Sequence, residues 1–101
     1  MASKVPKEIP VVVTTERRLV AFGYADPKEI EKKSFWLRSL RPCLFWPKGT
    51  SGFTGLAEIG PPADARVGGR SPRILLHDIT SVQECTPAAV AAWEAASCFG
   101  R

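Results

Sequence analysis

The chain of 101 residues is poor in the side chains from which most metal sites are built. His77 is the single histidine, and the three cysteines, Cys43, Cys85 and Cys98, show no C-x-x-C spacing. A structural zinc site takes four ligands of these two types, often in closely spaced pairs. We therefore expect no metal site, and we expect the cysteines to be reduced and structural.

Motifs for nucleophilic or phosphate-dependent chemistry are also missing. The sequence contains no G-x-x-x-x-G-K-[ST] loop and no G-x-G-x-x-G turn between a strand and a helix. On a strand, Asp78 would point away from its neighbour His77 and would orient it poorly. Ser71 and Cys43 remain as nucleophiles, but nothing in the sequence places either beside His77. We therefore expect a binding protein that is not an enzyme, with no catalytic residue and no cofactor.

Long apolar segments are absent as well. No run approaches the ~20 residues of a membrane-spanning helix, and residues 1–8 are polar. We expect a flexible N-terminus over 1–8 and a single ligand-binding domain over 9–101, in a cytoplasmic protein that does not enter a membrane. The net charge of +4 and the excess of arginine over lysine favour an anionic partner, although a solvated basic surface gives the same balance.

Local patterns predict an α+β fold with a small, mostly antiparallel sheet, a short central helix and a C-terminal helix. Apolar and β-branched runs predict strands at 11–14, 18–24, 34–38, 43–46, 73–77 and 79–85. A short helix is expected over 53–59. Thr86 as the N-cap and Pro87 at the first helical position predict a second helix over 88–96.

The segment 60–73 is the first candidate binding site. It holds three Gly, three Pro and three Arg, so we expect no regular element in it. Positive φ angles at Gly68-Gly69 would turn backbone N–H groups toward an anion. Arg66, Arg70 and Arg73 would add guanidinium donors for a phosphate. An ordinary loop with solvated or internally paired arginines is the alternative, and the sequence leaves both open.

Aromatic side chains form the second candidate. Phe35, Trp36, Phe45, Trp46 and Phe53 lie within twenty residues of one another. Alternation along a strand turns Phe35 and Trp36 to opposite faces, and likewise Phe45 and Trp46, so one of each pair can stack on a base. Phe53 follows a glycine-containing loop and is the ring most easily presented. Burial in the core is the alternative for each of them.

Several segments occur together in a characteristic order: 11–17, 43–46, 52–57, 60–61, 66–68, 78–82, 86–90 and 93–94. With this order, residues 9–96 resemble a family of small phage and prophage proteins that includes or borders the Thoeris anti-defence 1 signal sponges. The resemblance implies a homo-oligomer, built from dimers and reaching a hexamer. It also implies binding of cyclic ADP-ribose isomers, and in some members of cyclic oligonucleotides, without cleavage.

The resemblance implies particular residues too. Phe53 matches a ring that the family presents to the ligand, and Arg66 matches a recurrent arginine. Ala65 stands where a cysteine is expected, and Ala63 and Asp64 stand where a polar amide is expected. An aspartate there would repel a diphosphate, so the identity of the ligand stays open. The predicted ligand-binding residues are Phe53, Arg66, Gly68, Arg70, Arg73 and Trp46.

Two other functions fit the residues. The alternative to a signal sponge is a small phage module that binds nucleic acid or protein through the basic stretch 28–41 and an exposed Trp36, with nucleic acid as the less expected partner. A hydrolase built on His77 is the least expected function.

Nanomolar sequestration of a signal takes ~12 kcal/mol. A stacked base supplies roughly 1–3 kcal/mol and each charge-assisted hydrogen bond roughly 1.5–3 kcal/mol, so a preorganised pocket shared by two subunits is expected.

Overall fold

The computed structural model describes residues 8–16, 19–46, 52–62 and 65–96, apart from the side chains of residues 52 and 53. Within them the chain forms, in order, β1 (Ile9–Thr15), β2 (Val20–Ala25), β3 (Phe35–Phe45), α1 (Gly52–Glu58), β4 (Arg66–Val67), β5 (Ser71–Leu76), β6 (Ile79–Glu84) and α2 (Pro87–Ala95). The predicted α+β class, with a short helix and a C-terminal helix, is confirmed. No helix of this part of the chain has the length and apolar character needed to cross a membrane.

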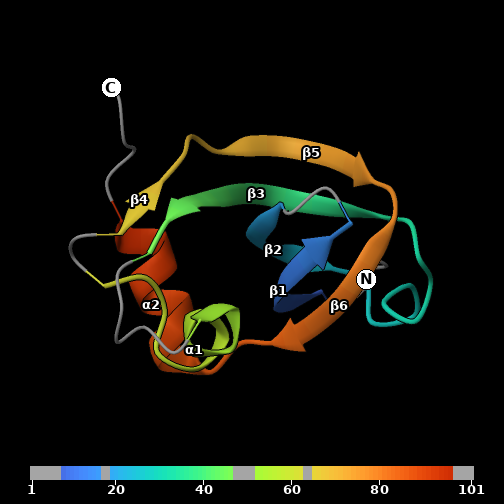
Figure 1. Cartoon of the computed structure of the whole chain (residues 1–101). Helices are drawn as coiled ribbons and strands as arrows, with labels where there is room; N and C mark the ends of the chain where they lie inside the picture. Colours follow the sequence, from blue (N-terminus) through green and yellow to red (C-terminus); the bar gives the residue numbers. More distant parts are fainter. Residues whose placement is uncertain (1–7, 17–18, 47–51, 63–64, 97–101) are drawn as a thin grey trace.

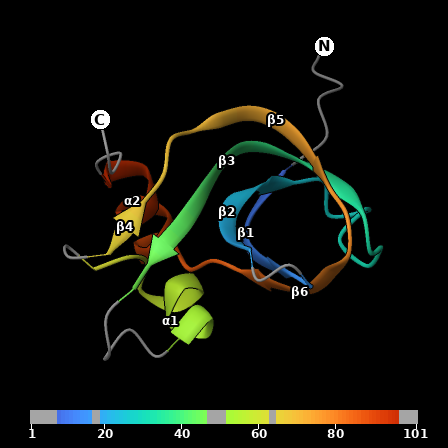
Figure 2. The same cartoon turned by 45° about the horizontal axis from the view of Figure 1, so that its top comes forward.

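All strand pairs are antiparallel, and the sheet runs in the order β4-β3-β2-β1-β6, with β5 also paired to β3. The sheet curls strongly, so that β5, β3, β2, β1 and β6 follow one another around a ring (Figure 2). Both helices lie together at one end of this ring (Figure 1). The curvature gives the sheet an inner face and an outer face, each of which buries its own core.

The inner core consists of strand residues alone: Val11, Val13, Ala21, Ala25, Phe35, Leu37, Leu40, Leu76 and Ile79. The second core, which we call the outer core, lies where the two helices cover the outer face: Val12, Val20, Phe22, Cys43, Leu56, Ala57, Val67, Ala89 and Trp93. At its centre the ring of Trp93 stacks on Phe22, with 5.2 Å between centroids and 11° between planes. The indole Nε1–H of Trp93 donates to the Leu56 carbonyl at 2.9 Å, which joins both helices to the sheet.

The predicted break between strands at 34–38 and 43–46 is wrong, because β3 runs through it as one strand of 11 residues. Ser39 has a φ of 55° at the point where the pairing with β2 shifts register, so the strand bends there without ending. Pro42 lacks an N–H, but its carbonyl accepts from Gly68 N–H at 2.8 Å just beyond the two-residue β4. The missing donor therefore falls on a sparsely paired edge, where proline is tolerated.

The expectation of no regular element over 60–73 is also wrong. β4 pairs with the end of β3, and β5 begins at Ser71 and passes through Pro72 and Arg73. Pairing on β3 overrides the turn-forming composition, and β5 has its described partner on one side only, which suits a proline. The consequence for function is that Arg73 sits on a strand, with a fixed neighbour opposite it.

The start of α2 follows the sequence prediction. Thr86 is the N-cap, and its hydroxyl oxygen accepts from Ala89 N–H at 3.1 Å, while Pro87 takes the first helical position. Gly60, just after α1, has a φ of +80°, and a Cβ there would come within 2.5 Å of the Ala92 Cβ. A glycine is therefore needed where the chain leaves α1 and touches α2.

Candidate functional site

The most developed surface feature is a set of arginine and aromatic side chains around β2, β3 and β5. We call it the arginine face and define it by Tyr24, Trp36, Arg38, Arg70 and Arg73. Alternation along β3 buries its inner residues and turns Trp36 and Arg38 outward, as predicted for Trp36, which is 47% exposed. In the sheet register Arg38 lies opposite Tyr24 on β2 and opposite Arg73 on β5. The pairing thus sets two arginines side by side.

Two of these arginines lie over aromatic rings. The Arg73 Cζ atom is 3.9 Å from the centroid of Trp36, and the Arg38 Cζ atom is 4.8 Å from the centroid of Tyr24. Each contact of this kind is worth about 0.5–1 kcal/mol at an exposed site. The rings therefore hold the guanidinium groups against the sheet while leaving their N–H donors at the surface.

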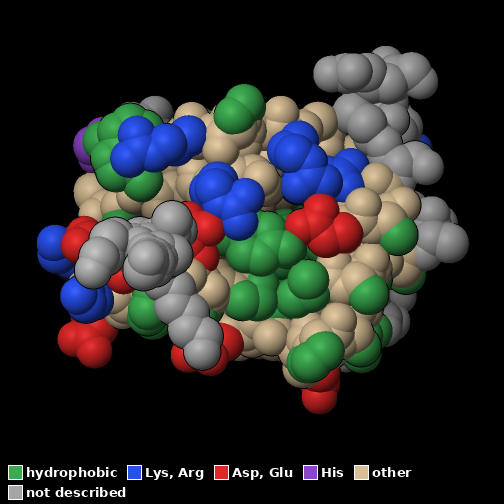
Figure 3. All heavy atoms as spheres, turned by 180° about the vertical axis from the view of Figure 1, so that it is seen from behind, with side chains coloured by type: hydrophobic (Ala, Val, Ile, Leu, Met, Phe, Trp, Pro, Cys, Tyr) green, Lys and Arg blue, Asp and Glu red, His purple; other side chains and the backbone are tan. Residues whose placement is uncertain are grey.

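A hollow of about 390 Å³ opens beside these arginines. Its lining residues are Glu8, Asp26, Glu29, Trp36, Leu37, Arg38 and Arg73. Arg38 Nε donates to Glu8 Oε1 at 2.5 Å, and Glu29 pairs with Lys32 at 2.8 Å. Figure 3 shows the face of the molecule opposite to the view of Figure 1, and on this face Lys and Arg side chains lie among hydrophobic and acidic ones. The hollow therefore combines two cations, one exposed ring and three carboxylates.

Glu94 of α2 fixes the other end of the arginine face. Its carboxylate accepts from the Tyr24 hydroxyl at 2.5 Å and from Arg70 at 2.7 Å. Partial burial, followed by the hydrogen bond to Glu94, raises the pKa of Tyr24 to about 12. The same hydrogen bond from Tyr24, reinforced by Arg70, lowers the pKa of Glu94. Arg70 is therefore engaged by a carboxylate of its own chain, whereas no ion pair of the described residues involves Arg73.

Titration of the tyrosine tests this contact. Tyr24 is the single tyrosine of the chain, so absorbance at 295 nm reports on it alone. We expect a midpoint near pH 12 in the folded protein, against about 10 in denaturant. Between these values the unfolded phenol ionises and the folded one does not, so the free energy of unfolding falls as pH rises through this window.

Glu94→Gln should lower the folded midpoint, because it removes the negative charge that opposes the phenolate. Glu84→Gln is the matched control, since Glu84 is exposed on β6. A wild-type midpoint near 10 would contradict the contact.

The predicted ligand-binding residues do not all gather in one place. Arg73 and Arg70 belong to the arginine face. Arg66 lies apart from them on β4, with its Cζ atom 5.4 Å from the centroid of Phe45. Trp46 is partly buried and packs against the outer core. The arginines of 60–73 therefore divide between two regions.

The predicted donor nest at Gly68-Gly69 is wrong. Gly60 is the one described glycine with a positive φ. Gly68 is buried, its N–H donates to the Pro42 carbonyl at 2.8 Å, and its carbonyl accepts from Arg41 Nη2 at 3.4 Å. A Cβ on Gly68 would meet the Pro42 ring at 2.8 Å, so this glycine is required by packing.

Some predictions fall on residues outside the described part of the chain. The backbone of Phe53 lies in α1, but its side chain is outside the description, as are Ala63 and Asp64. The sequence suggested Trp36 and the stretch 28–41 only for the alternative function, binding of nucleic acid or protein. It gave no indication that Tyr24, Glu8 and Glu94 belong to the same arginine face. Strand alternation pointed to Trp36, whereas the contacts of Glu8 and Glu94 come from distant elements and leave no local signal.

The structure does not bring the candidate nucleophiles Ser71 and Cys43 to His77. His77 Nδ1 lies 3.2 Å from Ser34 Oγ, whereas Ser71 is at the opposite end of β5. Burial raises the pKa of Cys43, and it raises that of Cys85 to about 12, which disfavours both thiolates. Within the described ranges, no three His, Cys, Asp or Glu side chains gather as they would around a metal ion.

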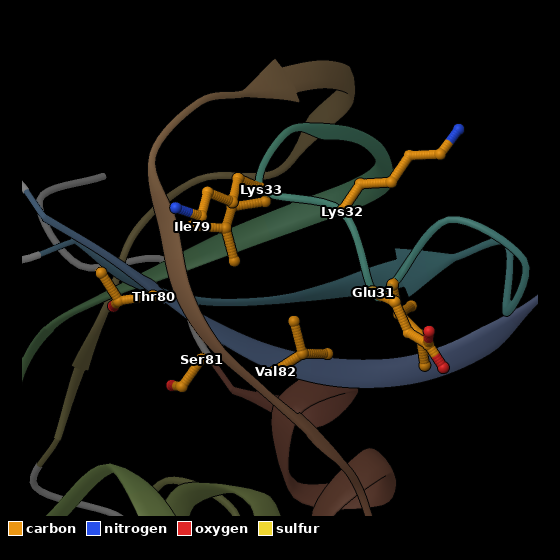
Figure 4. Close-up of a pocket in the computed structure, with 8 residues that line it drawn as sticks. Glu31, Lys32, Lys33, Ile79, Thr80, Ser81 and Val82 are labelled. Atoms are coloured by element: carbon orange, nitrogen blue, oxygen red, sulfur yellow. The ribbon is translucent and has the colours of Figure 1, made fainter.

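A second hollow, of about 250 Å³, lies between β6 and the turn before β3 (Figure 4). Its lining residues are Ile30, Glu31, Lys32, Lys33, Ile79, Thr80, Ser81 and Val82. A third, of about 260 Å³, lies between α1 and the end of β6. Neither lining contains an arginine or an aromatic ring. The hollow on the arginine face is therefore the candidate site.

Comparisons with known proteins add one finding. No curated protein and no solved structure matches the chain. Residues 8–93 match the family model described as "Domain of unknown function (DUF6948)". The match begins at Glu8, which contacts Arg38, and ends at Trp93 in the outer core, so it spans all six described strands. The chain therefore belongs to the DUF6948 family.

Proposed function

We propose that this protein binds a phosphorylated nucleotide on its arginine face and does not cleave it. One observation carries the proposal: Arg38 and Arg73 lie opposite each other on β3 and β5, next to the exposed ring of Trp36 and a hollow of about 390 Å³. Guanidinium groups suit phosphate oxygens, and an indole ring suits a base. The volume falls within the range of about 300–1,000 Å³ that is usual for small-molecule sites.

The groups of the arginine face set the binding free energy that one subunit can supply. A stacked base supplies roughly 1–3 kcal/mol, and each hydrogen bond to a charged group supplies roughly 1.5–3 kcal/mol. One ring and two arginines, each arginine with one such bond, therefore supply roughly 4–9 kcal/mol. The ~8 kcal/mol of micromolar binding lies near the upper end of this range. Nanomolar sequestration needs further contacts. A homo-oligomer in which a second subunit covers the ligand would supply them, and such an assembly is part of the proposal.

The first ligands to test are the cyclic nucleotide immune signals that the resemblance implies, above all cyclic ADP-ribose isomers. In this proposal the protein acts in the cytoplasm of a phage-infected bacterium and holds the signal intact. The proposal is supported by the chemistry of the arginine face together with the resemblance over residues 9–96. A sponge needs affinity and no catalytic group, and the arginine face offers cations and a ring.

Calorimetry with cyclic ADP-ribose isomers tests the proposal. We expect saturable binding, with the ligand recovered unchanged after heating of the complex. Arg73→Ala and Trp36→Ala should each weaken binding at least tenfold, since each removes a group that contacts the ligand. Arg66→Ala is the matched control, because Arg66 is also an exposed arginine over an aromatic ring but lies on β4.

Three results would count against it. Degraded ligand would indicate an enzyme, and no heat at high micromolar ligand would remove this ligand class. Loss of binding in Arg66→Ala but not in Arg73→Ala would move the site to the end of β3.

A second candidate function is binding of single-stranded nucleic acid. It is favoured by the exposure of Trp36 beside Arg38 and Arg73, since protruding rings and arginines on a sheet stack bases with little regard to sequence. Fluorescence anisotropy with a labelled oligonucleotide, measured over a range of salt concentrations, tests it. Binding that is tighter than that of any cyclic nucleotide and steeply salt-dependent would favour this function, and no binding at low salt would eliminate it.

A further inference from the structure

We propose that the hollow on the arginine face selects phosphodiesters over phosphate monoesters. A phosphodiester carries one negative charge, whereas a monoester carries about 1.5 to 2 at neutral pH. This inference rests on the proposed function and names the ligand class of the same site. Cyclic mono- and oligonucleotides and single-stranded nucleic acids share the diester, and in a cyclic ADP-ribose isomer each phosphorus of the diphosphate likewise carries one negative charge. The experiment below separates the small ligands from nucleic acid.

The first argument is the balance of charge around the hollow. Its lining contains two arginines, Arg38 and Arg73, and three carboxylates, Glu8, Asp26 and Glu29. Lys32, which pairs with Glu29, brings the formal charge of the group to zero. Sites that bind phosphate monoesters carry an excess of cations, because the second negative charge must also be met. One negative charge on a ligand can be met by Arg73 and by an Arg38 shared with Glu8, whereas a second negative charge finds no further cation in the lining.

The second argument is the contact of Glu8 with Arg38. The Glu8 carboxylate lies 2.5 Å from Arg38 Nε, in the position that a phosphate oxygen would take on that guanidinium. A bound anion must share Arg38 with Glu8 or displace it. Sharing places the ligand's charge beside a carboxylate, and the cost of this repulsion grows with the ligand's charge. Glu8 thus competes with the ligand for Arg38 and lowers the affinity for monoesters more than that for diesters.

The third argument is that Arg73 is available to form the first contact with a phosphate. Arg73 lies over Trp36, and no ion pair of the described residues engages it. Its guanidinium therefore meets the first phosphate oxygen. Arg70 does not offer the same, since Glu94 holds it at 2.7 Å.

The experiment compares two probes with the same base and sugar. Adenosine 3′,5′-cyclic monophosphate carries a diester, and adenosine 5′-monophosphate carries a monoester. We expect the cyclic diester to bind the full chain about tenfold more tightly, measured by calorimetry at pH 7.5 and low salt. A single-stranded hexamer of deoxyadenylate forms the third arm: tighter binding of the hexamer identifies nucleic acid as the source of the diester, and tighter binding of the cyclic probe identifies a small ligand.

Glu8→Gln should improve binding of the monoester about tenfold and that of the diester only slightly, so the preference shrinks. Glu29→Gln should act in the same direction. Glu31→Gln is the matched control, because Glu31 belongs to the same turn as Glu29 but lines the other hollow (Figure 4). It should leave the ratio of the two affinities unchanged.

The outcomes separate this inference from the proposed function. If the monoester binds as tightly as the diester, or if Glu8→Gln leaves the ratio unchanged, the inference is overturned while nucleotide binding stands. If neither probe, nor the hexamer, nor a cyclic ADP-ribose isomer binds, the proposed function fails and this inference fails with it. A ratio near ten that shrinks in Glu8→Gln but not in Glu31→Gln supports both.

Discussion

Trp93→Ala will lower the free energy of unfolding by about 3–5 kcal/mol, the usual cost of removing a large buried aromatic ring. Trp93 is 0% exposed, its ring stacks on Phe22, and its indole N–H donates to the Leu56 carbonyl. The substitution leaves a cavity between α2 and the sheet and deprives a buried carbonyl of its donor. Since domains of this size are stable by about 5–15 kcal/mol, much of the total is lost.

Urea unfolding followed by circular dichroism measures this effect, because it does not depend on tryptophan fluorescence. Trp36→Ala is the matched control. It removes the same side chain from an exposed position on β3, so its expected cost is under ~1 kcal/mol. Equal losses in the two variants would show that Trp93 does not occupy the centre of the outer core.

Arg41→Met will lower the free energy of unfolding by about 2–4 kcal/mol. Arg41 is 4% exposed, and its guanidinium donates to the Trp93 carbonyl at 2.6 Å and to the Gly68 carbonyl at 3.4 Å. It thereby joins the last turn of α2 to the chain that follows β4. Methionine fills much of the volume but donates no hydrogen bond, so two carbonyls lose a donor.

Chemical unfolding of three variants measures this contribution. Arg41→Lys keeps the charge without the planar fork and should fall between the wild type and Arg41→Met. Arg38→Met is the control, since Arg38 is half exposed and its surface ion pair with Glu8 is worth at most ~1 kcal/mol. A loss below ~1 kcal/mol in Arg41→Met would contradict the structural role assigned to Arg41.

Local signals in the sequence predicted the fold class and the start of α2. Thr86 and Pro87 act within one helical turn, and the β-branched run of β1 acts within one strand, so neither depends on distant residues. The continuity of β3 through Pro42 was not predictable in this way. It depends on the shortness of β4 and on a hydrogen bond from Gly68, which is 26 residues further along the chain.

The candidate site was predictable in part. The assumption of an irregular loop over 60–73 grouped Arg66 with Arg73, whereas pairing of β4 and β5 along β3 separates them. Strand alternation correctly turned Trp36 outward. The partners Glu8 and Glu94 come from the residue before β1 and from α2. Their contacts with Arg38 and Tyr24 join residues far apart in the sequence, and such contacts leave no pattern in a single sequence.

The ring of strands has a consequence for how the molecule forms. β5 and β6 follow each other after only two residues, yet β5 joins β3 while β6 joins β1 near the other end of the chain. The hydrogen bond between Thr14 and Ser81 spans 67 positions, so sealing β1 to β6 bears the greatest loss of chain freedom. The hairpin of β2 and β3 is far more local and carries Tyr24, Trp36 and Arg38. This part of the arginine face therefore has the lower entropic barrier to assembly, and we expect closure of the β1–β6 pair to be the slowest step.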